Sequence, residues 1–140
     1  MTVELLIAEY NKHPVNNFKM ENCTISRHEG NFICGDDITV YLKIDKEIIS
    51  DFSFDGNCST ITTAAASLLA ELIVGKSISE VMEWGYDTIA AHGLDVSPRR
   101  RRAAVISLLA VKNAIYIYQQ VLDPVSGEIK MEEFEDLLDD

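Results

Sequence analysis

The chain has 140 residues, of which 47% are hydrophobic and 25% are charged, as expected for one globular domain with its own core. Its formal net charge of −11 disfavours nonspecific nucleic-acid binding, because a phosphate backbone repels an acidic surface. No apolar run approaches the roughly 20 residues that a membrane-spanning helix needs, and no basic segment precedes an apolar stretch at the N-terminus. We therefore expect a cytoplasmic protein that binds neither nucleic acid nor a membrane.

The first half of the chain predicts one helix and then three strands. Residues 3–12 have the pattern of a short amphipathic helix that stops at Pro14. Strands are expected over residues 23–28, 38–44 and 48–54. Alternation places Ile38, Val40, Leu42 and Ile44 on one face of the second strand, and Ile48, Phe52 and Phe54 on one face of the third. The short link over residues 45–47 predicts an antiparallel meander with one buried face.

The second half of the chain predicts helices. Residues 60–74 are rich in alanine and leucine and end at Gly75, and a capping box at residues 77–80 opens the next helix. Ser97 and Pro98 open a helix that runs to about residue 122 and should be central, because it is apolar nearly all round. Strands followed by helices indicate an α+β domain over residues 1–122, with a three-stranded antiparallel sheet and about five helices mainly on one face. The acidic extension over residues 123–140 is expected to form a peripheral helix.

Two cysteines and an aspartate carry the candidate chemistry. Cys34 and Asp36 flank a glycine just before the second strand, and Cys58 directly precedes a helix. If strands two and three pair, Cys34 lies near Cys58, and the three side chains could form a metal site. Amide hydrogens at the start of a helix favour a thiolate over a thiol. A cysteine taken singly is more often a small buried side chain, and this is our interpretation of Cys23.

Four sequence blocks carry a more specific signal when they are taken together. They are His13-Pro14-Val15-Asn16-Asn17-Phe18, Cys34-Gly35-Asp36, Gly56-Asn57-Cys58-Ser59 and Gly75-Lys76-Ser77. Their order and spacing resemble those of the NifU/IscU-type scaffold proteins of iron–sulfur cluster assembly, over residues 10–120. The resemblance implies a three-stranded antiparallel sheet with helices on one side, in agreement with the pattern of the elements.

The resemblance also implies a function and a set of ligands. Members of the family hold a nascent cluster or a zinc ion with three cysteines and an aspartate, receive sulfur from a cysteine desulfurase, and pass clusters to acceptor proteins. By position, Cys34, Asp36 and Cys58 match these ligands. Alignment of the last core helix puts Ala103 where the third cysteine belongs, and Arg102 where some members have histidine. The implied role is a non-enzymatic scaffold or carrier for iron, a [2Fe–2S] cluster or zinc.

The missing thiol leaves several interpretations open. Two subunits could share one cluster through four thiolates, or a single subunit could bind zinc or iron weakly with water or a partner's thiol completing the shell. A degenerate paralogue could instead keep only partner docking, and a rival function is that of a zinc-dependent sulfur-transfer partner. His28 is a candidate for an extra ligand, whereas His13 and His92 are interpreted as ordinary surface or loop residues. Asp37 is an added carboxylate that could be an exposed charge at a strand edge.

A basic turn over residues 99–102 stands out in this acidic chain. Arg99, Arg100, Arg101 and Arg102 occupy the start of a helix, where cations oppose the helix dipole. That arrangement indicates a docking surface for an acidic partner, such as a desulfurase, a chaperone or the chain's own acidic extension. A solvated basic turn without a partner is the alternative.

Overall fold

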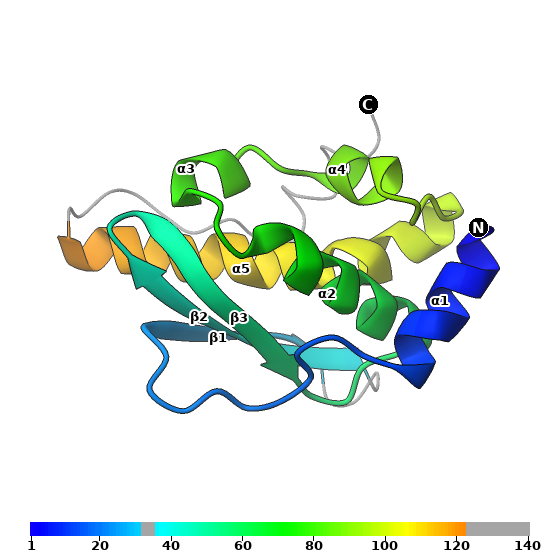
Figure 1. The fold of residues 1–140 in the computed structure, drawn as a ribbon, viewed down its shortest axis with the longest axis horizontal. Helices are drawn as coiled ribbons and strands as arrows, with labels where there is room; N and C mark the ends of the chain where they lie inside the picture. Colours follow the sequence, from blue (N-terminus) through cyan, green and yellow to red (C-terminus); the bar gives the residue numbers. More distant parts are fainter. Residues whose placement is uncertain (32–35, 123–140) are drawn as a thin grey trace.

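A computed structural model describes residues 1–31 and 36–122 (Figure 1). The elements in chain order are α1 (Val3–Lys12), β1 (Ile25–Asn31), β2 (Asp36–Asp45), β3 (Ile48–Asp55), α2 (Thr60–Ile73), α3 (Ile78–Val81), α4 (Tyr86–Ala91), the short 3-10 helix η2 (Pro98–Arg100) and α5 (Arg101–Leu122). This arrangement confirms the predicted α+β fold with strands followed by helices. The expected peripheral helix over residues 123–140 lies outside the described residues.

The three strands form an antiparallel sheet in the order β1-β2-β3. Lys46 and Glu47 connect β2 to β3 with φ angles of 52° and 68°, as in the tight hairpin turns whose twist suits neighbouring strands. A register shift between Lys43 and Ile44 changes which side chains of β3 face the core. Ile49 is consequently fully buried while Ile48 is 38% exposed, so the predicted burial of Ile48 is wrong.

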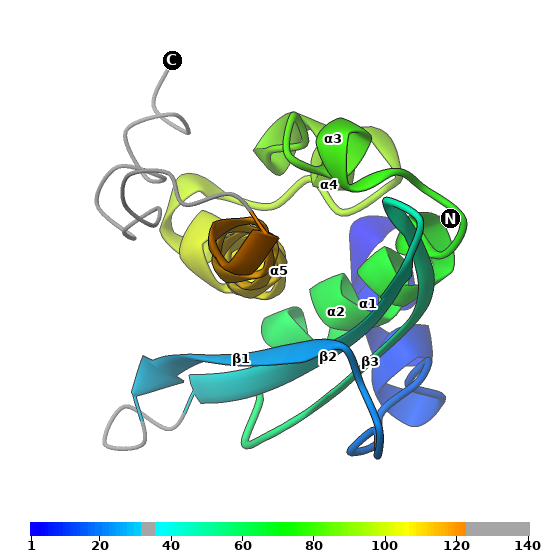
Figure 2. The same cartoon turned by 90° about the vertical axis from the view of Figure 1, so that its left-hand side faces the viewer.

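The helices cover one face of the sheet in two layers (Figure 2). Helix α5 packs on β1 and β2, and α2 packs on β3, while α3 and α4 lie beyond them. Residues 104–115 of α5 are all buried, which confirms that this helix is central. Helix α2 stops before Gly75, whose φ of +91° suits a glycine after a helix end. Among the described helices, none has the length and apolar character needed to cross a membrane.

The segment after α1 runs along the free edge of β3. The backbone N–H of Phe54 donates to the carbonyl of Asn16 at 3.0 Å, and the Asn16 side-chain amide donates to the carbonyl of Phe52 at 2.8 Å. The Asn16-Asn17 pair therefore acts as a short added strand that satisfies backbone groups of β3. This contact holds the third strand in place where it leads towards Cys58.

Candidate functional site

The carboxylate of Asp36, the first residue of β2, is hydrogen-bonded to the start of α2. The Asp36 carboxylate accepts hydrogen bonds from the Ser59 backbone N–H at 3.1 Å and the Ser59 hydroxyl at 3.3 Å. It also accepts one from the Thr62 hydroxyl at 2.9 Å. Ser59 is the N-cap of α2, so Asp36 lies where helix amide hydrogens and the helix dipole favour a negative charge. The antiparallel pairing thus brings Asp36 beside Cys58, although 22 residues separate them in the sequence.

Cys58 lies in this same corner with three carboxylates around it. Its thiol donates to the backbone carbonyl of Asp37 over 3.4 Å. Burial raises the pKa of the Cys58 thiol to about 12, and repulsion from Asp36, Asp37 and Asp55 contributes to the shift. The predicted preference for thiolate is therefore wrong for the chain without a bound cation. The physical reason is that burial and the nearby carboxylates both disfavour a negative charge on the sulfur.

Asp37 lies on the opposite face of β2 from Asp36, because successive side chains of a strand alternate. Asp37 is only 4% exposed, and its Oδ1 is 3.2 Å from Nε2 of His28 on β1. Its Oδ2 is buried and has no hydrogen-bond partner among the residues that the structure describes. Asp37 is therefore not the exposed strand-edge charge that the sequence allowed. His28 lies on the Asp37 side of the sheet.

The other predicted candidates fall in different parts of the molecule. Cys34 lies outside the described residues. Cys23 is half-buried rather than fully buried, and its neighbour Thr24 donates to Leu42, six residues along β2 from Asp36. At ~3.4 Å per residue, this places Cys23 about 20 Å from the Asp36 end of the strand. Over residues 1–31 and 36–122, no group of three or more His, Cys, Asp or Glu side chains is arranged to hold a metal ion.

The structure also shows where the other histidines and the arginines of the basic turn lie. His13 caps α1 and is exposed, and His92 bonds to the carbonyl of Thr88 at 2.8 Å. The guanidinium carbon of Arg101 lies 4.7 Å from the centre of the Tyr86 ring, a cation–π contact. Arg99, Arg100 and Arg102 are exposed at the start of α5. The basic turn therefore has three exposed arginines and one, Arg101, that packs against Tyr86.

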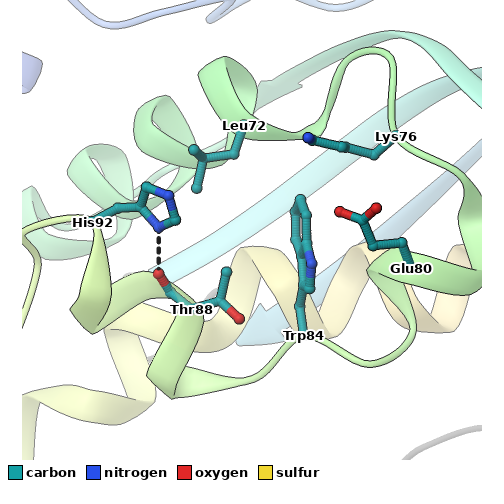
Figure 3. A pocket seen from close by; sticks show the side chains of 6 residues that line it. All are labelled: Leu72, Lys76, Glu80, Trp84, Thr88 and His92. Carbon is teal, nitrogen blue, oxygen red and sulfur yellow. Dashed lines mark hydrogen bonds between the residues drawn. The ribbon is translucent and has the colours of Figure 1, made fainter.

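A separate hollow of about 190 Å³ lies over the far end of α2 (Figure 3). Its lining residues come from α2, α3, α4 and the connections between them, and are Leu72, Lys76, Glu80, Trp84, Thr88 and His92. The Trp84 indole stands between Leu72 and His92 on one side and Lys76 and Glu80 on the other. None of these residues belongs to the Asp36–Cys58 corner, at the opposite end of α2. The hollow therefore does not contribute to that corner.

The donors in the Asp36–Cys58 corner suit a thiophilic metal cation. A cysteine sulfur and an aspartate oxygen are both ligands that zinc and iron accept. The negative charges of Asp36, Asp37 and Asp55 disfavour a thiolate at Cys58, and a nearby cation would offset them. Two described ligands are fewer than the four that a tetrahedral metal requires. A metal bound here would need further ligands, for which the sequence offers Cys34.

The family model described as the NifU-like N terminal domain matches residues 4–123. The chain belongs to this family. The IscU iron–sulfur cluster assembly scaffold protein of Thermotoga maritima is 36% identical over 63 residues, 45% of this chain and 44% of that protein. The zinc-dependent sulfurtransferase SufU of Bacillus subtilis is 26% identical over 128 residues, 79% of this chain and 86% of that protein.

A solved structure shows the same NifU-like fold. The SufU protein of Fervidobacterium islandicum AW-1 superposes with a TM-score of 0.68 at 24% identity, over 79% of this chain and 93% of that one. The chain spans about half the length of several curated IscU relatives that it matches. The family and the fold are therefore established, whereas the activity has to be argued from the site.

Sequence reasoning missed three residues of this NifU-like site. Ser59 and Thr62 supply the hydroxyls that hold Asp36, and Asp55 raises the pKa of Cys58. Ser59 was recognisable as an N-cap from its place before an alanine-rich helix. Thr62 and Asp55 gave no comparable signal, because their roles depend on how β2, β3 and α2 meet.

Proposed function

We propose that this NifU-like chain is a non-enzymatic scaffold or carrier for iron–sulfur cluster assembly. Its cargo is iron or a nascent cluster, and its sulfur comes from a cysteine desulfurase. The observation that carries the proposal is the meeting of Asp36 and Cys58 at one end of the sheet. Asp36 lies two residues after Cys34 in the sequence, so the predicted second thiol is close along the chain. Membership of the NifU-like family supports the same function.

Each residue of the corner has a distinct role in this proposal. Cys34 and Cys58 bind the cargo through sulfur, which suits iron–sulfur clusters. Asp36 offers a harder oxygen ligand that is already engaged with Ser59 and Thr62. Binding of Asp36 to the cargo competes with those hydrogen bonds. That competition favours a labile complex from which a cluster can be handed on.

The proposal needs ligands beyond one subunit's two thiols. A homodimer could supply four thiolates, two from each subunit, around one [2Fe–2S] cluster. A thiol of the desulfurase or the acceptor protein could instead complete the shell. The exposed Arg99, Arg100 and Arg102 form a surface on which an acidic partner could dock. A cytoplasmic location would keep the cysteines reduced for this role.

Anaerobic reconstitution with ferrous iron and sulfide tests the scaffold function. The unmodified chain should develop visible cluster absorbance and retain iron through gel filtration. Cys34→Ser and Cys58→Ser should each lose most of that absorbance. Cys23→Ser is the matched control, because Cys23 lies about 20 Å from Asp36 at ~3.4 Å per strand residue, and it should behave like the unmodified chain. A colourless, iron-free unmodified protein would contradict the proposal.

The second candidate is zinc-dependent sulfur transfer, which is favoured by similarity over 86% of the Bacillus subtilis SufU protein. A bound zinc ion would supply charge that keeps the cysteine sulfurs deprotonated. In this reaction a thiolate of the chain bonds to the sulfane sulfur of the desulfurase persulfide, and the desulfurase cysteine leaves as a thiolate. No external oxidant is needed, because the sulfane sulfur keeps its oxidation state.

Metal analysis and mass spectrometry distinguish the two functions. The sulfur-transfer function predicts one retained zinc ion and a persulfide on Cys34 or Cys58 after incubation with desulfurase and cysteine. Chelation of the zinc should abolish that transfer, and the protein should show no iron chromophore. A protein in which both cysteines can be changed to serine without effect on partner binding, metal content or sulfur transfer would be a docking paralogue.

A further inference from the structure

One buried hydroxyl connects three elements around the Asp36–Cys58 corner. Thr62 lies in the first turn of α2 and is fully buried. Its Oγ1 is 2.9 Å from Oδ2 of Asp36 at the start of β2, and 3.3 Å from the carbonyl oxygen of Ala103 in the first turn of α5. The residue at the position of the missing third thiol is therefore one hydrogen bond away from Thr62.

The number of protons makes these two contacts alternatives. A threonine hydroxyl has one proton, so it donates to one of the two oxygens at a time. Asp36 is the nearer acceptor and carries charge, so it receives the stronger bond. The Ser59 hydroxyl lies 3.1 Å from the Thr62 oxygen and 3.3 Å from Oδ2 of Asp36, and its single proton can likewise be donated to only one of them at a time.

A purely structural explanation accounts for only part of this arrangement. Asp36 already accepts the backbone N–H of Ser59, which fixes it to the start of α2, and the Ser59 hydroxyl is a second donor within reach. Thr62 adds a third donor that has a second acceptor within reach. If Asp36 turns away from Thr62, the buried hydroxyl can bond to Ala103 and avoids the cost of an unpaired polar group. The carboxylate can thus move without leaving a buried donor unsatisfied.

We propose that Thr62 is a positioning residue that controls how readily Asp36 binds a metal cation. It holds the carboxylate against α2 in the empty site and transfers its hydrogen bond to the Ala103 carbonyl when a cation draws Asp36 away. This assignment rests on the proposed metal-binding function of the site. Because Thr62 competes for the carboxylate, Asp36 binds a cation more weakly than a carboxylate without such a donor would.

Release of Co²⁺, followed by its thiolate absorbance during a chelator chase, tests the assignment in the full chain. Thr62→Val removes the hydroxyl at nearly constant volume and should slow release by about three- to tenfold, the effect of one competing hydrogen bond. Thr62→Ser keeps the hydroxyl and should release Co²⁺ like the unmodified chain. Thr63→Val is the matched control on the same helix, and it should also leave the rate unchanged.

A second background separates positioning from helix stability. With Asp36→Ala already present, Thr62→Val should not change Co²⁺ release further, because Thr62 acts through the carboxylate. An equal effect in both backgrounds would overturn the assignment. If the unmodified chain binds no Co²⁺, the proposed function fails and this assignment fails with it. If it binds Co²⁺ and Thr62→Val releases it at the unmodified rate, only the assignment fails.

A measurement on the unmodified chain covers the case in which Thr62→Val does not fold. The carbonyl ¹³C resonance of Ala103 should move downfield on saturation with Zn²⁺, because this oxygen gains the hydrogen bond of Thr62. The same carbonyl in the Thr62→Ser variant should respond alike. An unchanged Ala103 carbonyl resonance in the Zn²⁺-saturated protein would overturn the proposed transfer.

Discussion

At the scale of single residues, Gly56 determines how closely the end of β3 approaches β2 beside Cys58. Its φ is +132°, and a Cβ atom there would lie 2.5 Å from the carbonyl oxygen of Asp37. Gly56→Ala should therefore combine backbone strain with a backbone clash, and lower the free energy of unfolding by more than about 2 kcal/mol. Urea denaturation of the metal-free protein measures this change.

Gly75→Ala is the matched control for the clash. Gly75 has a φ of +91°, but a Cβ atom there would meet no atom within 4 Å. The control should show only the strain of a left-handed alanine, about 1–2 kcal/mol. Equal destabilisation by the two variants would mean that the loop before Cys58 moves aside at no cost.

Ala103 is the position at which the family resemblance predicts a third thiol. It is half-buried, and its carbonyl already contacts Thr62 in the site. Ala103→Cys should raise the amount of zinc or iron retained through gel filtration severalfold, because a further thiolate fills an open coordination position. Ala90→Cys, at a half-buried position on α4, controls for the added thiol. Equal metal retention by the two variants would place residue 103 too far from the other ligands.

The sequence predicted that Asp36 and Cys58 lie at one end of the sheet, as the structure shows, but it did not predict the state of the thiol. A cysteine before a helix is expected to favour thiolate, yet burial, together with repulsion from three carboxylates, raises the pKa of Cys58. The charges of Asp37 and Asp55 act on the thiol because β2 and β3 lie side by side, which residue spacing alone does not show. Thr62 was missed for the same reason, since a threonine in an alanine-rich helix has no distinctive pattern.

At the scale of elements, Tyr86 fixes the connection from α4 to the basic turn. Its hydroxyl lies 2.7 Å from a carboxylate oxygen of Asp95 and accepts the N–H of Val96 at 2.8 Å. Tyr86→Phe should lower the free energy of unfolding by about 1–3 kcal/mol, because it leaves the buried Val96 N–H without this partner. Thermal and urea unfolding measure the loss.

The Phe variant keeps the ring on which Arg101 stacks, so the expected loss belongs to the hydroxyl. Tyr116→Phe, at a half-buried position on α5, is the matched control and should change stability by less than about 0.5 kcal/mol. If Tyr86→Phe costs no more than this control, the connection before η2 does not depend on the Tyr86 hydroxyl.

The order and type of the elements followed from the sequence more reliably than their details. Alternation in β2 and the glycine after α2 each marked the predicted element, because these signals act locally. Pro98 opens the short 3-10 helix η2 rather than α5, which begins at Arg101. The face of Ile48 was predicted wrongly, since the register shift in β2 depends on how two strands pair. The start of β1 at Ile25 rather than residue 23 has a similar cause, because pairing with β2 sets where that strand begins.

At the scale of the whole molecule, the central helix α5 has one buried lysine. Lys112 is 5% exposed, and burial lowers its pKa from the ordinary value of 10.5. The folded protein therefore holds this proton less tightly than the unfolded chain does, so protonation favours unfolding. This contribution is fully unfavourable below the folded-state pKa, and disappears as the pH rises through 10.5.

Lys112→Met should consequently change the pH dependence of stability. Relative to the Met variant, the unmodified protein should gain stability as the pH rises from the lowered folded-state pKa of Lys112 towards 10.5, because the buried lysine loses its proton before the unfolded chain does. Urea denaturation at several pH values gives the difference. Lys112→Arg is the matched control, since a guanidinium stays charged throughout. It should lose stability relative to the unmodified protein as the pH rises. A pH-independent difference for both variants would show that Lys112 keeps its charge inside the folded protein.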